Sequence, residues 1–95
     1  MLFKCLIRGE NFPGQLIKSR GLHGFYATRF VEAETAEEAE ILGLELLRQE
    51  PGLQVKSEKL RKQDPPAKVF FEKIEAVRDS TPRVPNAGAT WFEMK

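Results

Sequence analysis

The chain has 95 residues, 41% of them hydrophobic, and its 15 basic and 14 acidic side chains leave a formal net charge of +1. This length accommodates one domain, 1–95, with a thin core, and the hydrophobic content excludes an intrinsically disordered chain. The balanced charge disfavours a general nucleic-acid binder, because such proteins usually carry a clear basic excess.

The chain contains one cysteine, Cys5, and one histidine, His23. An intramolecular disulfide is therefore impossible, and no structural zinc site or other cofactor is expected. The apolar run at the beginning of the sequence is interrupted by Lys4 and Arg8, which makes it too short for a signal-peptide core or a membrane span. We therefore expect a cytoplasmic protein with no membrane contact.

Two strands are predicted in the first third of the chain. Residues 2–8 form the first, with Phe3, Cys5 and Ile7 sharing the expected buried side through two-residue alternation. Glycine and proline residues interrupt any regular pattern over 9–24, which predicts a long connection. The strongest strand signal covers 25–34, where neither side is cleanly polar, so both sides are expected to contact protein over part of their length.

A single amphipathic helix is predicted from Thr35 to Gln49. The sequence Thr35-Ala36-Glu37-Glu38 matches a capping box, in which the threonine hydroxyl accepts a hydrogen bond from the amide three residues later. Pro51 and Gly52 end the helix.

The remaining elements are weaker. A polar third strand is predicted at 53–60, a rigid turn at Asp64-Pro65-Pro66, and a fourth strand at 68–77, for which a short helix is the alternative. An irregular arm, 80–95, follows, with a short closing strand at 90–94. This order predicts an α+β fold: an antiparallel four-stranded sheet, with a possible fifth C-terminal strand, and one helix packed on one face.

Four basic residues suggest an anion-binding site. Arg8, Lys18, Arg20 and Arg29 would converge if the 9–24 connection folded over the sheet, and Tyr26 and Phe30 could then stack on a base. The ordinary alternative places the basic residues on a solvated face and the aromatic residues in the core. His23 lies in the same connection and suits a ligand or proton-transfer role, or it is simply an exposed loop residue.

Other candidate chemistries have weaker support. Cys5 alternates with core residues and is expected to be a small buried hydrophobe. Glu32 and Glu34 share one side of a strand and would suit acid–base work only if buried. The 9–14 segment has the glycine spacing at which a phosphate loop begins, but Gln15 and Leu16 stand where lysine and serine or threonine are needed. We therefore expect a turn there.

The helix carries more apolar surface than one sheet requires. Leu44 lies at the edge of its main apolar stripe and Ile41 lies almost opposite the stripe, and a single helix cannot cover both faces of a sheet. Trp91 and Phe92 in the arm would cover part of this excess, and a second copy of the chain would cover the rest. The leading hypothesis is a non-enzymatic interaction or accessory domain that self-associates as a homodimer. The alternative is a binder of nucleic acid or a phosphate-bearing small molecule through Arg8, Arg20, Arg29 and Tyr26, and an enzyme using His23 or the Glu32/Glu34 pair is the third hypothesis.

The middle third and the tail resemble a known pattern. The sequence GFYATRFVEA at 24–33, the TAEEA helix start at 35–39 and the GATWF ending at 88–92 are similar to those of short uncharacterised bacterial α+β proteins. The strand followed by an acidic helix start is also faintly similar to small antitoxin-like α+β domains. The bacterial group has no assigned activity, so the resemblance implies no functional residue.

Overall fold

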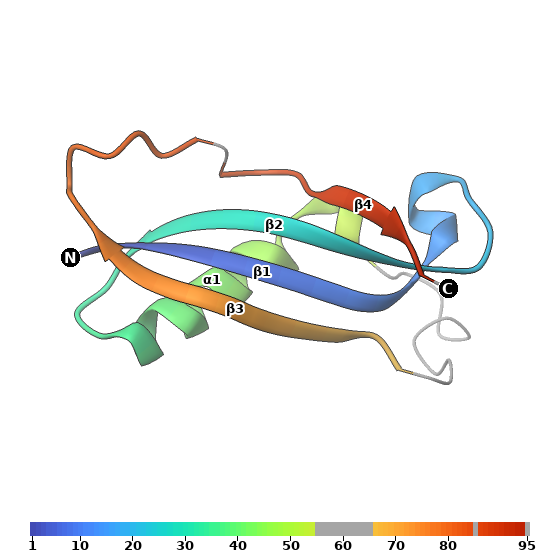
Figure 1. Cartoon of the computed structure of the whole chain (residues 1–95), viewed down its shortest axis with the longest axis horizontal. Coiled ribbons are helices and arrows are strands. Elements are labelled where there is room, and N and C mark those ends of the chain that lie inside the picture. The colour runs from blue at the N-terminus through green and yellow to red at the C-terminus, as the bar shows by residue number, and fades with distance from the viewer. Residues whose placement is uncertain (55–65, 85, 95) are drawn as a thin grey trace.

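The computed structural model describes residues 1–54, 66–84 and 86–94. Its strands are β1 (Leu2–Pro13), β2 (Leu22–Glu32), β3 (Lys68–Val77) and β4 (Thr90–Glu93), and its helix is α1 (Ala36–Arg48). Short 3-10 turns occupy Gly14–Ile17 and Pro51–Leu53. The four strands form one antiparallel sheet in the order β3-β1-β2-β4, with α1 packed against one face (Figure 1). The predicted fold class is confirmed.

The strand predicted at 68–77 is confirmed as β3, and the alternative short helix is wrong. Residues 68–77 form β3, while Leu53 lies in a 3-10 turn rather than at the start of a strand. Gln54 caps that turn, while residues 55–60 of the strand predicted at 53–60 and most of the predicted Asp64-Pro65-Pro66 turn lie outside the described residues. The closing strand expected in the C-terminal arm exists as β4 and completes the sheet.

The long connection predicted over 9–24 is wrong, because β1 continues to Pro13 and β2 begins at Leu22. Gly9 pairs with Phe25 and Phe12 with His23, so two residues of β1 oppose one of β2 and form a bulge. Asn11 within this bulge adopts a φ of 60°, a left-handed conformation that asparagine tolerates better than most residues. The strands are therefore joined by a compact loop over 14–21, whose ends are held by the Gly14 amide donating to the Gly21 carbonyl.

The helix begins as predicted. The Glu38 amide donates to the Thr35 hydroxyl over 3.1 Å, and Glu37 and Glu38 place negative charge in the first turn. Gly43 faces the sheet, where an added Cβ would lie 3.0 Å from the ring of Phe71 and 3.6 Å from Cys5 Sγ. The missing side chain therefore lets α1 approach β3 and β1 closely.

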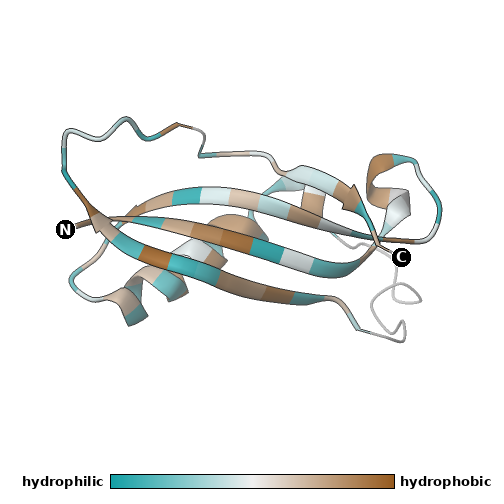
Figure 2. Cartoon of the chain, in the orientation of Figure 1, coloured by the Kyte–Doolittle hydropathy of each residue, from teal (hydrophilic) through white to brown (hydrophobic). Residues whose placement is uncertain are grey.

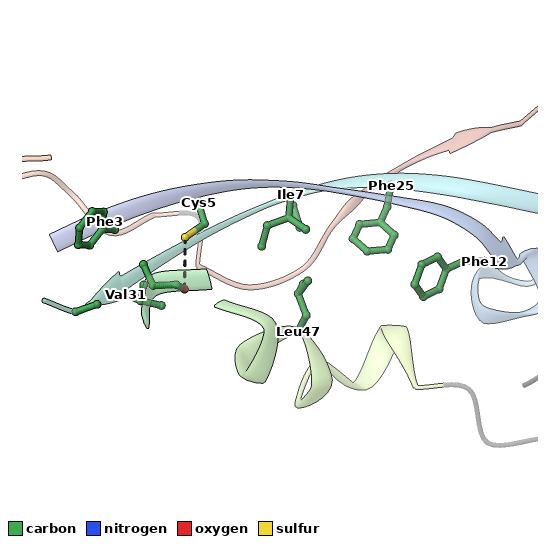
Figure 3. Close-up of a cluster of buried hydrophobic side chains, with 10 residues drawn as sticks. Phe3, Cys5, Ile7, Phe12, Phe25, Val31 and Leu47 are labelled. Carbon is green, nitrogen blue, oxygen red and sulfur yellow. Dashed lines mark hydrogen bonds between the residues drawn. The ribbon is translucent and has the colours of Figure 1, made fainter. Parts of the chain in front are cut away.

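The core lies between α1 and the sheet. Figure 3 shows Phe3, Cys5 and Ile7 of β1 facing the helix, as predicted, with Phe25 and Val31 of β2 beside them. Phe25 contacts Phe12 edge to face, with ring centroids 5.0 Å apart, and Trp91 of β4 at 5.4 Å. These contacts tie β4 to the core although it pairs with β2 over only four residues.

The sheet face opposite α1 is called the open face below. Hydrophobic and hydrophilic residues alternate along the strands (Figure 2), as expected of a sheet with only one covered face. The arm that follows β3 crosses the end of the sheet to reach the far edge of β2 (Figure 1). Leu2 and Phe30 also point toward the open face, but they are buried at this end. The rest of the open face has no described element packed on it.

Candidate functional site

Arg8 lies on the open face in β1, between β2 and β3. It is paired in register with Phe70 of β3 and with Tyr26 of β2, so the three side chains form a row across three strands. The Arg8 guanidinium carbon lies 5.1 Å from the centroid of the Phe70 ring, within the range of a cation–π contact. The sheet thus brings together two of the predicted site residues, Arg8 and Tyr26.

The positive charge of Arg8 is already compensated. Its guanidinium contacts Glu10 at 2.9 Å and Glu72 at 3.1 Å, and all three side chains are partly exposed. Lys73 and Glu75, both in β3, form a further ion pair at 3.2 Å. The open face is therefore mixed in charge rather than basic.

Aromatic side chains flank the Arg8 row. Tyr26 is 45% exposed and Phe70 is 40% exposed, and Leu6 on the central strand is 37% exposed. Phe92 of β4 packs against Tyr26 with ring centroids 5.2 Å apart. The open face thus presents a cluster of apolar side chains bordered by ion pairs, and Leu6 and Phe70 were not among the residues predicted to form a site.

The remaining predicted ligand residues lie elsewhere. Lys18 and Arg20 are exposed in the hairpin loop at one end of the sheet. His23 is buried within β2, only 7% exposed, and not in a loop as predicted; its Nδ1 has no hydrogen-bond partner among the described residues. Because the 14–21 loop ends the hairpin rather than folding over the sheet, the expected convergence of basic residues does not occur.

Arg29 lies on the helix side of the sheet, opposite Cys5 in register, and is 1% exposed. One terminal nitrogen donates to the Thr28 carbonyl at 2.8 Å and the other to the Gly88 carbonyl at 3.0 Å. The Glu50 carboxylate lies 4.0 Å away and accepts from the Gly88 amide at 2.5 Å. Burial lowers the pKa of Arg29, and the charge of Glu50 partly offsets this effect. Arg29 therefore joins β2, the end of the helix and the arm, and its guanidinium does not reach the open face.

A shallow pocket of about 390 Å³ lies where the arm diverges from β2. It is lined by Tyr26, Ala27 and Thr28 and by residues 87–90 of the arm. Beyond this point the Phe30 amide donates to the Asn86 side chain at 2.8 Å, so a side chain replaces strand pairing. None of these lining residues has a charged side chain, so the pocket lacks groups that would bind an ion or catalyse proton transfer.

The predicted pair of carboxylates is exposed. Glu32 forms an ion pair with Arg83 at 2.6 Å, and the hydrogen bond and charge of Arg83 lower the pKa of Glu32. Glu34 is also exposed. A carboxylate acting as a general base needs a raised pKa, so the lowered pKa of Glu32 opposes that role, and Glu32 instead attaches the arm to β2.

The four predicted interface residues have different environments. Ile41 is 64% exposed on the outer side of α1, and Leu44 is partly buried in a second pocket of about 220 Å³ with Val69 and Leu47. Trp91 packs into the core and Phe92 packs on Tyr26. The arm therefore covers part of the apolar excess from within the chain, as expected, and leaves Ile41 exposed.

Cys5 is buried, and its thiol donates to the Ala39 carbonyl oxygen at 3.9 Å from Sγ (Figure 3). Burial, assisted by the charge of Glu40, raises the thiol pKa above its ordinary value of 9.0. A nucleophilic thiol needs the opposite shift. The structure thus places Cys5 in the core, as the alternation predicted.

The Cys5 environment predicts a pH dependence of stability. Above pH 9.0 the unfolded chain releases the thiol proton while the fold retains it, so the free energy of unfolding should fall faster with pH than in a Cys5→Ala variant. Urea unfolding of both proteins at about pH 8 and about pH 10 measures the two slopes. Equal slopes would show that the thiol ionises as readily in the fold as in the unfolded chain.

No family model, curated protein or solved structure matches this chain. The resemblance to short bacterial proteins therefore remains an expectation. Within the described ranges, no three His, Cys, Asp or Glu side chains are grouped to hold a metal ion. In the same ranges, no helix is long and apolar enough to cross a membrane.

Proposed function

We propose that this chain is a small non-enzymatic accessory domain that associates with a second copy of itself, in the cytoplasm. One observation carries the proposal: α1 covers one face of the sheet, and the other leaves Leu6, Tyr26 and Phe70 exposed together. Apolar side chains grouped in this way are typical of interaction surfaces. The mixed charge of the same surface suits a protein partner better than a polyanion.

A second copy suits the open face and the β3 edge that borders it, because the charges there are balanced. In a two-fold dimer the same surface patch meets itself, so a patch of one sign would repel its copy. Arg8 lies between Glu10 and Glu72, so acidic and basic groups alternate within a few ångströms. Self-association of this surface therefore brings opposite charges within reach without a large net repulsion.

The proposal predicts a concentration-dependent dimer. Sedimentation equilibrium between low and high micromolar protein should show the mass rising from one chain toward two. A single-chain mass across the whole range would contradict the proposed function. Raising the salt concentration should separate apolar from ionic contributions, because ionic contacts are screened and apolar contacts are not.

Nucleic-acid binding is a second candidate, favoured by one specific observation. Tyr26, Phe70 and Phe92 flank Arg8 on an exposed antiparallel sheet, which is the arrangement on which single-stranded bases stack. The two carboxylates paired with Arg8 oppose this function, because a phosphate would have to displace them. Fluorescence anisotropy with a single-stranded oligonucleotide at low salt tests it, and binding that Tyr26→Ser abolishes would favour it over self-association.

A further inference from the structure

The outer edge of β3 is a free strand edge among the described residues. β3 pairs with β1 on one side, and the strand order places no described strand on its other side. Edge strands carry unpaired backbone donors and acceptors, and they invite pairing with another chain unless charge, bulges or covering segments prevent it. The side chains of β3 therefore decide what this edge accepts.

The first half of β3 has a self-complementary pattern. Residues 68–72 are Lys68, Val69, Phe70, Phe71 and Glu72, with opposite charges at the ends and only apolar side chains between them. In an antiparallel pair centred on Phe70, each Lys68 faces the Glu72 of the other copy. Each Val69 then faces a Phe71, and the two Phe70 side chains face each other.

The two faces of the sheet agree with this register. Lys68 and Phe70 lie on the open face with their register partners Glu10 and Arg8, and Glu72 reaches Arg8 on that face. Val69 and Phe71 lie on the helix side, where they pack partly against the core. Directly opposed side chains in an antiparallel pair are close enough to interact, so both the charged and the apolar pairs would form contacts.

A bulge limits the pairing to this half of the strand. Leu6 pairs with Lys73 and Ile7 with Phe71, so Glu72 is the additional residue in β3. A bulge interrupts the regular ladder and bends the strand, which opposes pairing that continues beyond it. Lys73 and Glu75 on the far side are paired with each other within the chain. The regular edge therefore ends at Phe71, and Glu72 in the bulge is the last side chain of this half that reaches a partner strand.

We infer that a second copy of this chain pairs with residues 68–72 of β3, antiparallel about Phe70. The two sheets then form one continuous sheet, with both α1 helices on the same side and both open faces on the other. The inference rests on the proposed self-association and places the contact at the β3 edge that borders the open face, with Phe70 belonging to both surfaces. The opposite charges of Lys68 and Glu72 favour a second copy of the same edge as the partner and determine the register of the pair.

Charge reversal tests the register directly. Lys68→Glu places two acidic pairs across the axis, and Glu72→Lys places two basic pairs there. Each variant alone should raise the dimer dissociation constant at least about ten-fold, because two attractive cross-strand pairs become repulsive. Lys73→Glu is the matched control, since it changes a charge beyond the bulge and should leave association near that of the wild type.

Mixing the two variants gives the decisive measurement. A Lys68→Glu chain facing a Glu72→Lys chain has opposite charges at both contacts, so the mixture should form a heterodimer although neither variant associates well alone. Association of both single variants at wild-type strength would overturn the inference and leave the proposed function standing. A mixture as weak as the single variants would also overturn it. A monomeric wild type would contradict the proposed function itself, and this inference with it.

Discussion

Replacing Arg29 with alanine is expected to lower the free energy of unfolding by about 3 kcal/mol, a large share of the 5–15 kcal/mol typical of small domains. The Arg29 side chain is 1% exposed and donates to the carbonyls of Thr28 and Gly88. Alanine leaves both acceptors without these donors and leaves the Glu50 carboxylate without its nearby positive charge. Urea unfolding measures the loss.

The same variant should loosen the arm before the rest of the fold. Arg29 connects β2 to Gly88, two residues before β4 begins at Thr90. Trp91 packs against Phe25 in the core, so detachment of the arm should shift its fluorescence toward that of a water-exposed indole. Arg20→Ala removes an exposed arginine from the hairpin loop and is the matched control, with an expected change within about 0.5 kcal/mol. Similar stabilities for the two variants would refute the anchoring role of Arg29.

Gly9→Ala is expected to destabilise the fold by a similar amount, about 3 kcal/mol, because it overpacks the centre of the sheet. A Cβ at Gly9 would lie 2.0 Å from Cε2 of Phe25, a distance that real contacts do not allow. Phe25 is fully buried and contacts Phe12 and Trp91, so its ring has little freedom to move aside. Thermal or urea unfolding measures the effect.

Gly52→Ala is the matched control for this substitution. Apart from its chain neighbours, no atom of the described residues lies within 4 Å of the position that its Cβ would occupy, so the change should stay within about 0.5 kcal/mol. If Gly9→Ala were as stable as Gly52→Ala, the close packing of the Phe25 ring over β1 would be wrong.

The local elements of this fold could be predicted from the sequence. The capping box at Thr35 and the alternation of Phe3, Cys5 and Ile7 depend on neighbours in the chain, and both appear in the structure. The end of the first strand was missed because Gly9 and Pro13 usually interrupt a strand. Here pairing with β2 continues past Gly9 through the bulge at Asn11, and tertiary contacts outweigh the local preference.

The candidate site was only partly predictable, because strand register depends on contacts far apart in the sequence. Arg8 and Tyr26 were expected in one site, and their pairing across β1 and β2 places them side by side. Arg29 shares the alternation of Phe25 and Val31, which pointed to the helix side and away from Arg8. The opposite charges of Lys68 and Glu72 were visible in the sequence, but their meaning required β3 to be an edge strand.

The helix side of the sheet stabilises the fold, and the open face with its β3 edge is the side that is free to associate. On the helix side, Arg29 and the Phe25 cluster hold the arm, β2 and α1 together. On the open face, Arg8 and Phe70 are positioned by the same sheet, and the β3 edge beside them is free among the described residues. Substitutions on the first side should therefore change stability, and charge reversals at the β3 edge should change association.

Amide hydrogen exchange at increasing protein concentration reports both the association of two chains and the residues at which they pair. Pairing of two β3 edges should slow exchange at residues 68–72 as concentration rises, because amides that face water become hydrogen-bonded. Exchange in β4 should stay unchanged, and in the Lys68→Glu variant residues 68–72 should exchange as fast at high concentration as at low. Exchange in β3 that is independent of concentration, or protection that increases elsewhere, would contradict the account.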